Sequence, residues 1–288
     1  MAGAQEAANT GRQPFAWYYL RVTGLLMVAL VLVHLFLMHY ASAPSATTSA
    51  FVAGRWSPSA GWRLFDWALL ALALTHGIVG VQGMLREAVR GAAARAAVDL
   101  GGGTAAIIFL VLGTAAVGAG APPDRAAGPL SSATWIPAAL IAALAAVATA
   151  TYAGIAAAGV AFAWRLLRRE PLGRWSYAGQ WAFALNRIAG AGVLGFLLLH
   201  VVDVALVPFA PALYDRTVAA YAMPYLVPME AGLVAAVVYH ALDGMRLMVL
   251  EVLDRRAATA GPASFVAILV LTVTLSLPAL AVLLGWRP

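Results

Sequence analysis

Long apolar runs alternate along the chain with short polar segments that carry most of the arginines. Seven of these runs have about 20 residues or more, which is enough to cross a hydrocarbon core of about 30 Å. Only helices satisfy the backbone of such long unbroken apolar runs in lipid. The pattern predicts an all-α integral membrane protein with seven transmembrane helices, at about 17–40, 65–89, 98–119, 135–165, 182–207, 226–250 and 264–286.

The composition agrees with this prediction. Of the 288 residues, 63% are hydrophobic and 10% are charged, and the mean hydropathy is +0.86. Such values lie outside the range of soluble globular domains. The chain has no cysteine, which excludes disulfides, thiolate-bound clusters, covalent c-type haem and a cysteine nucleophile. A redox metal would therefore need histidine, methionine or carboxylate ligands.

Arginine supplies the whole positive charge, since the chain has 18 arginines and no lysine. With a cytoplasmic N-terminus, 13 of them fall in cytoplasmic segments and five outside, as the positive-inside rule requires. The densest cluster, "WRLLRRE" at 164–170, ends the fourth span. We expect a multi-pass protein of the inner (cytoplasmic) membrane, with a cytoplasmic N-terminus, an exterior C-terminus and no nucleic-acid surface.

An internal repeat organises the apolar runs. "RVTGLLMVALVLVH" (21–34) and "RIAGAGVLGFLLLH" (187–200) share an arginine, a glycine three residues later and a histidine thirteen residues later. A second histidine follows each of these, 42 residues later in one half and 40 in the other. Each second histidine has an acid ten residues before it, a glycine four after it and a glutamate eleven after it; the residues are Asp66, His76, Gly80 and Glu87, and Glu230, His240, Gly244 and Glu251.

The repeat predicts two three-helix units in one polypeptide. Three spans end on the opposite side from their start, so two units in the same orientation need one additional crossing, which 135–165 supplies. We expect a cytoplasmic N-terminal segment (1–16), a first half of three spans (17–119), an exterior loop with a linker transmembrane helix (120–170) and a second half of three spans (171–288).

Four histidines at repeat positions inside a membrane point to a function, because intramembrane ionisable residues are costly. Neutral imidazole binds haem iron, and haem b needs only two histidines on opposite faces of the porphyrin. Gly80 and Gly244 lie on the same helix faces as His76 and His240, where a missing side chain leaves room for a flat ring. Close helix packing through small residues explains these glycines nearly as well.

Depth in the membrane predicts which histidines pair. His34 and His200 lie thirteen residues, about 20 Å, from the arginine of their repeat, and His76 and His240 lie eleven residues, about 16 Å, from the inner glutamate. We therefore expect an inner pair, His76 with His240, and an outer pair, His34 with His200, at levels that differ by a few ångströms. The fifth histidine, His39, has no repeat partner and is expected at the outer interface beside Tyr40.

These motifs resemble the cytochrome b membrane anchors of succinate dehydrogenase and fumarate reductase. "NRIAGAGVLGFLLLHVVDVAL" and "EAGLVAAVVYHALDGMRLMVLE" are similar to the larger, C-type anchor subunit, and "FAWYYLRVTG", "FVAGRWSP" and "THGIVGVQGML" to the smaller, D-type one. The resemblance covers nearly everything except about 120–170. It implies a fusion of two anchor subunits that are normally separate chains.

The resemblance also implies roles for single residues. His76 and His240 match the ligands of the haem nearest the iron–sulfur subunit, and His34 and His200 match the second pair of diheme members. Arg21 and Arg187 match arginines that meet haem propionates and line the inner quinone site, and Arg246 matches an arginine that follows the C-type motif. The chain departs from the family at Asn186 and Ala88, where histidine and a quinone-binding tyrosine are common.

The sequence therefore predicts the membrane anchor and cytochrome b subunit of succinate dehydrogenase. Such a subunit passes electrons from a partner iron–sulfur subunit through two b haems to quinone, with menaquinone preferred by resemblance. Succinate oxidation belongs to a partner flavoprotein, since this chain has no GxGxxG flavin motif and no cluster ligands. An oligomer of the whole complex is compatible with the resemblance. Two alternatives stay open: another quinone-linked diheme cytochrome b, and a haem-free proton-coupled transporter that uses the histidines as relays.

Overall fold

The computed structural model is all-helical and describes residues 2–57, 60–120, 146, 174–221, 223, 224, 226–252 and 257–286. In this part of the chain, six helices are long and apolar enough to cross a membrane. Their bounds match six predicted spans to within six residues: Phe15–Tyr40, Ala60–Ala88, Ala92–Ala119, Trp181–Phe209, Val227–Leu250 and Pro262–Leu283. Apart from residue 146, the predicted span 135–165 and the arginine cluster at 164–170 lie outside the described residues.

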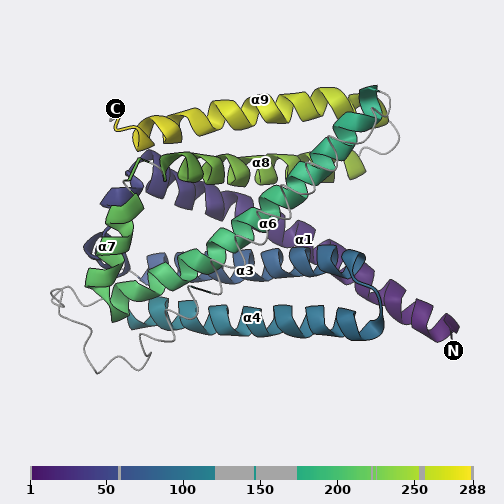
Figure 1. Ribbon diagram of the computed structural model, residues 1–288, viewed down its shortest axis with the longest axis horizontal. Helices are drawn as coiled ribbons and strands as arrows, with labels where there is room; N and C mark the ends of the chain where they lie inside the picture. Colours follow the sequence, from purple (N-terminus) through teal and green to yellow (C-terminus); the bar gives the residue numbers. More distant parts are fainter. Residues whose placement is uncertain are drawn as a thin grey trace.

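Four long helices form the central bundle. They are α1 (Ala2–Leu35), α3 (Ala60–Ala88), α6 (Arg174–Phe209) and α8 (Val227–Val252). α1 packs against α3, and α6 packs against both α3 and α8. Figure 1 shows that α6 crosses the other helices obliquely and so joins the α3 side of the bundle to the α8 side.

Two further long helices flank this bundle. α4 (Ala92–Ala119) packs on α3 and α6, and α9 (Ala257–Leu283) packs on α8 and α6. Only three residues separate α3 from α4, and Gly91 makes this turn with a φ of +90°, a conformation that residues with a side chain rarely adopt. The Arg86 guanidinium pairs with the Asp99 carboxylate across the hairpin.

Short helices cover one end of the bundle, which we call the capped end. After α1, the chain continues as a π-helix, η1 (Phe36–Tyr40), a 3-10 turn, η2 (Pro44–Ala46), and α2 (Ser49–Trp56), and α7 (Pro211–Tyr221) follows α6. The Ser49 backbone N–H and hydroxyl both donate to the Asp215 carboxylate, at 2.7 and 2.9 Å, which ties α2 to α7. We call the opposite end, where α1 and α6 carry Arg21 and Arg187, the arginine end.

The outer surface of the long helices is apolar. Large side chains such as Leu25 on α1, Ile107 on α4 and Val270 on α9 are more than half exposed. Water does not favour such a surface, whereas lipid chains solvate it. Together with the six long apolar helices, this surface identifies a multi-pass membrane protein.

Candidate functional site

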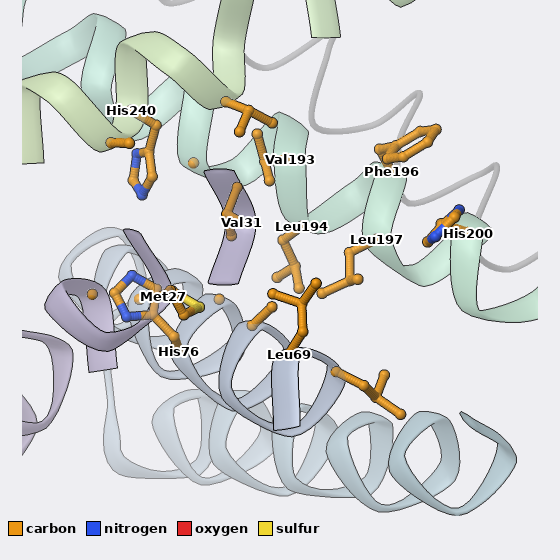
Figure 2. Close-up of a pocket in the computed structure, with 18 of the residues that line it drawn as sticks. Met27, Val31, Leu69, His76, Val193, Leu194, Phe196, Leu197, His200 and His240 are labelled. Atoms are coloured by element: carbon orange, nitrogen blue, oxygen red, sulfur yellow. The ribbon is translucent and has the colours of Figure 1, made fainter. Parts of the chain in front are cut away.

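The bundle contains a partly open cavity of about 1200 Å³, larger than the pockets that hold most drug-sized ligands. Its walls come mainly from α1, α3, α6 and α8, and all four repeat histidines line it. Figure 2 shows His76 and His240 facing each other at one end of the view and His200 beside Phe196 at the other, with apolar side chains between them.

The structure brings the histidines together in the two predicted pairs. The ring centres of His76 and His240 are 6.3 Å apart, and those of His34 and His200 are 6.1 Å apart. In both pairs the rings are nearly perpendicular, with interplanar angles of 81° and 78°. Each pair joins one histidine from the first half of the chain to one from the second half.

In the inner pair, each Nδ1 atom donates a hydrogen bond to an oxygen atom in its own half of the chain. His240 Nδ1 lies 3.1 Å from the Asn186 carbonyl oxygen, which only accepts, so Nδ1 donates. His76 Nδ1 lies 2.9 Å from the Thr23 hydroxyl. That hydroxyl donates its hydrogen to the Tyr19 carbonyl at 2.6 Å, so its oxygen accepts from His76. In the neutral rings the lone pair therefore lies on Nε2.

Glycines three residues after the repeat arginines make room for the inner rings. A Cβ atom on Gly24 would lie 3.4 Å from His76 Cε1, and one on Gly190 would lie 2.6 Å from His240 Cε1. The predicted packing glycines, Gly80 and Gly244, line the cavity with open space where a Cβ would be. The shared glycine of the repeat thus has a structural role: it lies directly against the ring of the second histidine of its own half, and we say that it seats this ring.

The structure separates the two pairs along the helices. Gly24 precedes His34 by ten residues, and Gly190 precedes His200 by ten, which corresponds to about 15 Å along α1 and α6. Since α6 crosses the bundle obliquely, equal residue counts on different helices do not cover equal depth (Figure 1).

The outer pair lies beside a buried ion pair near the capped end. The Asp66 Oδ1 atom is 4.0 Å from His34 Nδ1, and its Oδ2 atom accepts hydrogen bonds from the Arg55 guanidinium and, at 2.8 Å, from Trp56 Nε1. The His200 ring stacks on Phe196, with ring centres 5.6 Å apart. The outer pair therefore has charged neighbours, whereas the inner pair has neutral hydrogen-bond partners.

The three arginines named from the sequence have different positions. Arg21 and Arg187 line the cavity at the arginine end. Arg21 lies over the Trp17 ring, and Arg187 donates to both oxygens of Glu87 at 2.7 and 3.0 Å. Arg246 is not among the cavity-lining residues, and its Nε donates to the carboxylate of Asp243, in the preceding turn of α8, at 2.8 Å. The structure thus gives Arg246 no contact with the site.

Several cavity residues were not assigned a role from the sequence. His39 was expected at the outer interface, and in the structure the π-helical turn η1 also brings it to the cavity wall, together with Met38. From α7, Tyr214 lines the cavity near the capped end, and burial raises its pKa to about 12, so the phenol stays neutral. The sequence signal that could have predicted α7 is a short amphipathic segment that follows the prolines at the end of the fifth apolar run.

The donor set fits a haem in each pair. A metal ion lies about 2 Å from an imidazole nitrogen, which is itself roughly 1 Å from the ring centre, so two imidazoles on opposite sides of one ion have ring centres about 6 Å apart. Both observed distances agree with this value. An edge-to-face ring contact spans a similar distance. The inner pair has further features that haem binding needs and a simple ring contact does not. These are the two Nε2 lone pairs, the glycines beside the rings and the large apolar cavity.

Among the described residues, no group of three or more His, Cys, Asp or Glu side chains could hold a free metal ion. The histidines occur as opposed pairs, the arrangement that a planar macrocycle with two axial ligands needs. The site therefore favours a haem over a mononuclear metal centre.

Comparisons with known proteins agree with the motifs. Residues 165–277 match the model of the family described as "Succinate dehydrogenase/Fumarate reductase transmembrane subunit". The chain is 41% identical over 73 residues to "Succinate dehydrogenase 2 membrane subunit SdhC" of Mycobacterium tuberculosis, a match over 25% of this chain and 54% of the relative. It is 29% identical over 82 residues to "Succinate dehydrogenase hydrophobic membrane anchor subunit" of Halobacterium salinarum, over 27% of this chain and 63% of the relative.

The chain thus spans between about half and two thirds of the length of these two relatives. No solved structure gives a significant match. The matched segment contains α6, α8 and most of α9, and with them His200 and His240. In its C-terminal part, the chain is thus similar to the succinate dehydrogenase and fumarate reductase transmembrane subunits, the family that its motifs resemble.

Proposed function

We propose that this protein is the membrane anchor and cytochrome b subunit of a succinate dehydrogenase complex and that it holds two b haems. His76 and His240 bind the inner haem, and His34 and His200 bind the outer one. The observation that carries the proposal is the meeting of repeat-equivalent histidines in two opposed pairs across one cavity, with ring centres 6.3 and 6.1 Å apart.

A haem held by these histidine pairs would supply one-electron redox chemistry. The protein supplies position and surroundings. Thr23 and the Asn186 carbonyl fix the orientation of the inner imidazoles, and the apolar walls keep water away. Arg21 and Arg187 carry positive charge at the arginine end, where they meet haem propionates or an entering quinone.

We propose the direction of electron flow of a succinate dehydrogenase. Electrons come from an iron–sulfur subunit, which is reduced by a flavoprotein that oxidises succinate, and they leave to quinone in the bilayer, for which menaquinone is our expectation. This chain contributes no flavin motif and no cysteine ligands, so succinate oxidation belongs to the partners. The names of the two relatives describe membrane subunits of the same enzyme, which supports this assignment.

We further propose that the chain is a fusion of a D-type half, 17–119, and a C-type half, 171–288. A seventh span within 120–170 would join them, with the N-terminus (1–16) in the cytoplasm and the C-terminus outside the inner membrane. Equivalent contacts in the two halves support the duplication: Gly24 of α1 seats His76 of α3, and Gly190 of α6 seats His240 of α8.

Reduction by succinate in native membranes tests the proposed function. Succinate should reduce haem with sharp α bands in membranes that contain the full chain, and the flavoprotein and iron–sulfur subunits should purify with it in detergent. Haem that dithionite reduces but succinate does not, in a preparation without these partners, would instead indicate another quinone-linked diheme cytochrome b. A colourless protein would favour the haem-free transporter.

A further inference from the structure

Buried polar atoms without a hydrogen-bond partner among the described residues gather beside the outer pair. They include Arg55 Nε and Nη1 as well as His34 Nδ1 and Asp66 Oδ1, and the last two lie 4.0 Å from each other. A buried polar group without a partner costs about 1–3 kcal/mol. A hydrogen bond between His34 Nδ1 and Asp66 Oδ1 would satisfy both, and it requires a shortening of about 1 Å, which a small rotation of the two side chains provides.

The Asp66 carboxylate is held so that only Oδ1 is free to serve His34. Its Oδ2 atom accepts from the Arg55 guanidinium and from Trp56 Nε1 at 2.8 Å. The Trp56 side chain is 2% exposed and belongs to the core, so this anchor is rigid. The residue therefore offers His34 a fixed acceptor with a negative charge.

An acceptor at this position decides which nitrogen of His34 carries the hydrogen. A carboxylate only accepts, so Nδ1 of a neutral ring must donate, and the lone pair then lies on Nε2. The inner pair has the same arrangement of hydrogens, but there the acceptors are the neutral Thr23 hydroxyl and Asn186 carbonyl. A carboxylate acceptor makes a metal-binding imidazole more electron-rich than a neutral acceptor does.

We propose that Asp66 is a positioning residue for the outer haem: it fixes the hydrogen of His34 on Nδ1, so that Nε2 is the ligand atom, and it makes this ligand more electron-donating than a neutral acceptor would. The inference rests on the proposed function, since it concerns a haem bound by His34 and His200. Because an electron-rich ligand favours oxidised iron, Asp66 lowers the midpoint potential of the outer haem relative to a variant without the charge.

Substitution by asparagine gives the sharpest test, because it keeps the shape and exchanges an acceptor for a donor. In Asp66→Asn, the amide oxygen can still accept from Arg55 and Trp56, and the NH₂ group then faces His34. His34 Nδ1 must accept, the hydrogen moves to Nε2, and the ligand atom is lost. We expect the haem content of the full chain to fall from two per chain to about one.

The remaining haem should have the α band of the His34→Ala variant, and its presence shows that the bundle has folded. Asp66→Ala removes the carboxylate and places no donor there, so we expect two haems with a higher midpoint potential for the outer one in a redox titration followed by visible absorption. Asp66→Glu, which restores a carboxylate, should keep two haems. Two haems with unchanged midpoint potentials in both Asp66→Asn and Asp66→Ala would overturn the inference.

Trp56→Phe is the matched control for local packing. It removes one hydrogen bond to the other oxygen of Asp66 and leaves the charge and Oδ1 in place, so we expect two haems. Loss of the outer haem in this variant would overturn the inference, because packing and not the acceptor would then explain Asp66→Asn. A wild-type chain without haem overturns the proposed function together with this inference. Two haems in wild type, with unchanged haem content and midpoint potentials in the Asp66 variants, overturn the inference alone.

Discussion

The two histidine pairs have the same geometry but different surroundings. The inner pair is seated on glycines and held by uncharged oxygen atoms of α1 and α6. The outer pair lies next to the Arg55–Asp66 ion pair, under the short helices of the capped end. If each pair holds a haem, as we propose, these different neighbours set how each haem binds and how easily it is reduced.

The largest effect is expected when an inner ligand is removed. Under the proposed function, His240→Ala would take away one axial ligand of the haem nearest the iron–sulfur partner, so electrons would lose their first acceptor in the membrane. We predict loss of the inner α band and of nearly all succinate-dependent quinone reduction. His39→Ala is the matched control, since it removes a cavity histidine that the proposal does not use. If His39→Ala lost a haem and His240→Ala did not, the assignment of the pairs would be wrong.

Substitution of the inner glycines by alanine should affect haem binding differently in the two halves of the repeat. A Cβ on Gly190 would lie 2.6 Å from His240 Cε1, so Gly190→Ala must displace this ring, and we predict that most of the inner haem is lost. At Gly24 the distance to His76 Cε1 is 3.4 Å, and we predict that Gly24→Ala keeps the haem with a small spectral shift.

Gly192→Ala, which has open space around the added atom, serves as the control. Haem content per chain measures all three variants. Equal haem content in Gly190→Ala and Gly192→Ala would contradict the contact between Gly190 and His240.

Thr23→Val tests the neutral hydrogen-bond partner of His76. Valine has nearly the same shape as threonine but accepts no hydrogen bond, so His76 Nδ1 loses its acceptor. Loss of such a partner lowers metal affinity about 10–100-fold, and we predict weaker haem retention during purification with an intact outer haem. Thr272→Val, at a buried threonine of α9 whose hydroxyl donates only within its own helix, is the control. Equal retention in both variants would mean that Thr23 does not orient His76.

The smallest effect is expected at the salt bridge between the halves. Glu87→Gln weakens the pairing with Arg187, whose side chain is 34% exposed beside a Glu87 that is 62% exposed. Solvent screens such a pair, so we predict a change in stability below about 1 kcal/mol, with both haems retained. Thermal loss of the α bands measures it. A marked loss of the inner haem would instead assign Glu87 a role in holding Arg187 at the site.

The spans could be predicted because lipid imposes a simple length and composition rule. Runs such as 17–40 and 226–250 differ from the structure by at most two residues at their ends. The short helices of the capped end could not be found in this way, because α2 and α7 have 8 and 11 residues and lie outside the long apolar runs. The π-helical turn η1 has no distinct signal in sequence, since it continues α1 without a break.

The part of the site that could be predicted is the part that the sequence repeats, because equivalent positions in the two halves indicate which residues share a role. The four histidines followed from matching spacings in the two halves, and their pairing followed from their expected depth in the membrane. The contacts of Thr23, Asp66 and Gly190 did not follow, because they depend on how neighbouring helices cross. Arg246 shows the limit of carrying a role over from a family motif, because its side chain donates to the carboxylate of Asp243, three residues before it on α8.

The number of haems per chain tests the central claim most directly. The full chain, purified with its partners, should yield two b haems per chain in a pyridine haemochrome assay, and one in either His34→Ala or His240→Ala. A value of two in both variants, or the absence of haem from wild-type protein that retains its partner subunits, would contradict the claim that each opposed histidine pair holds one haem.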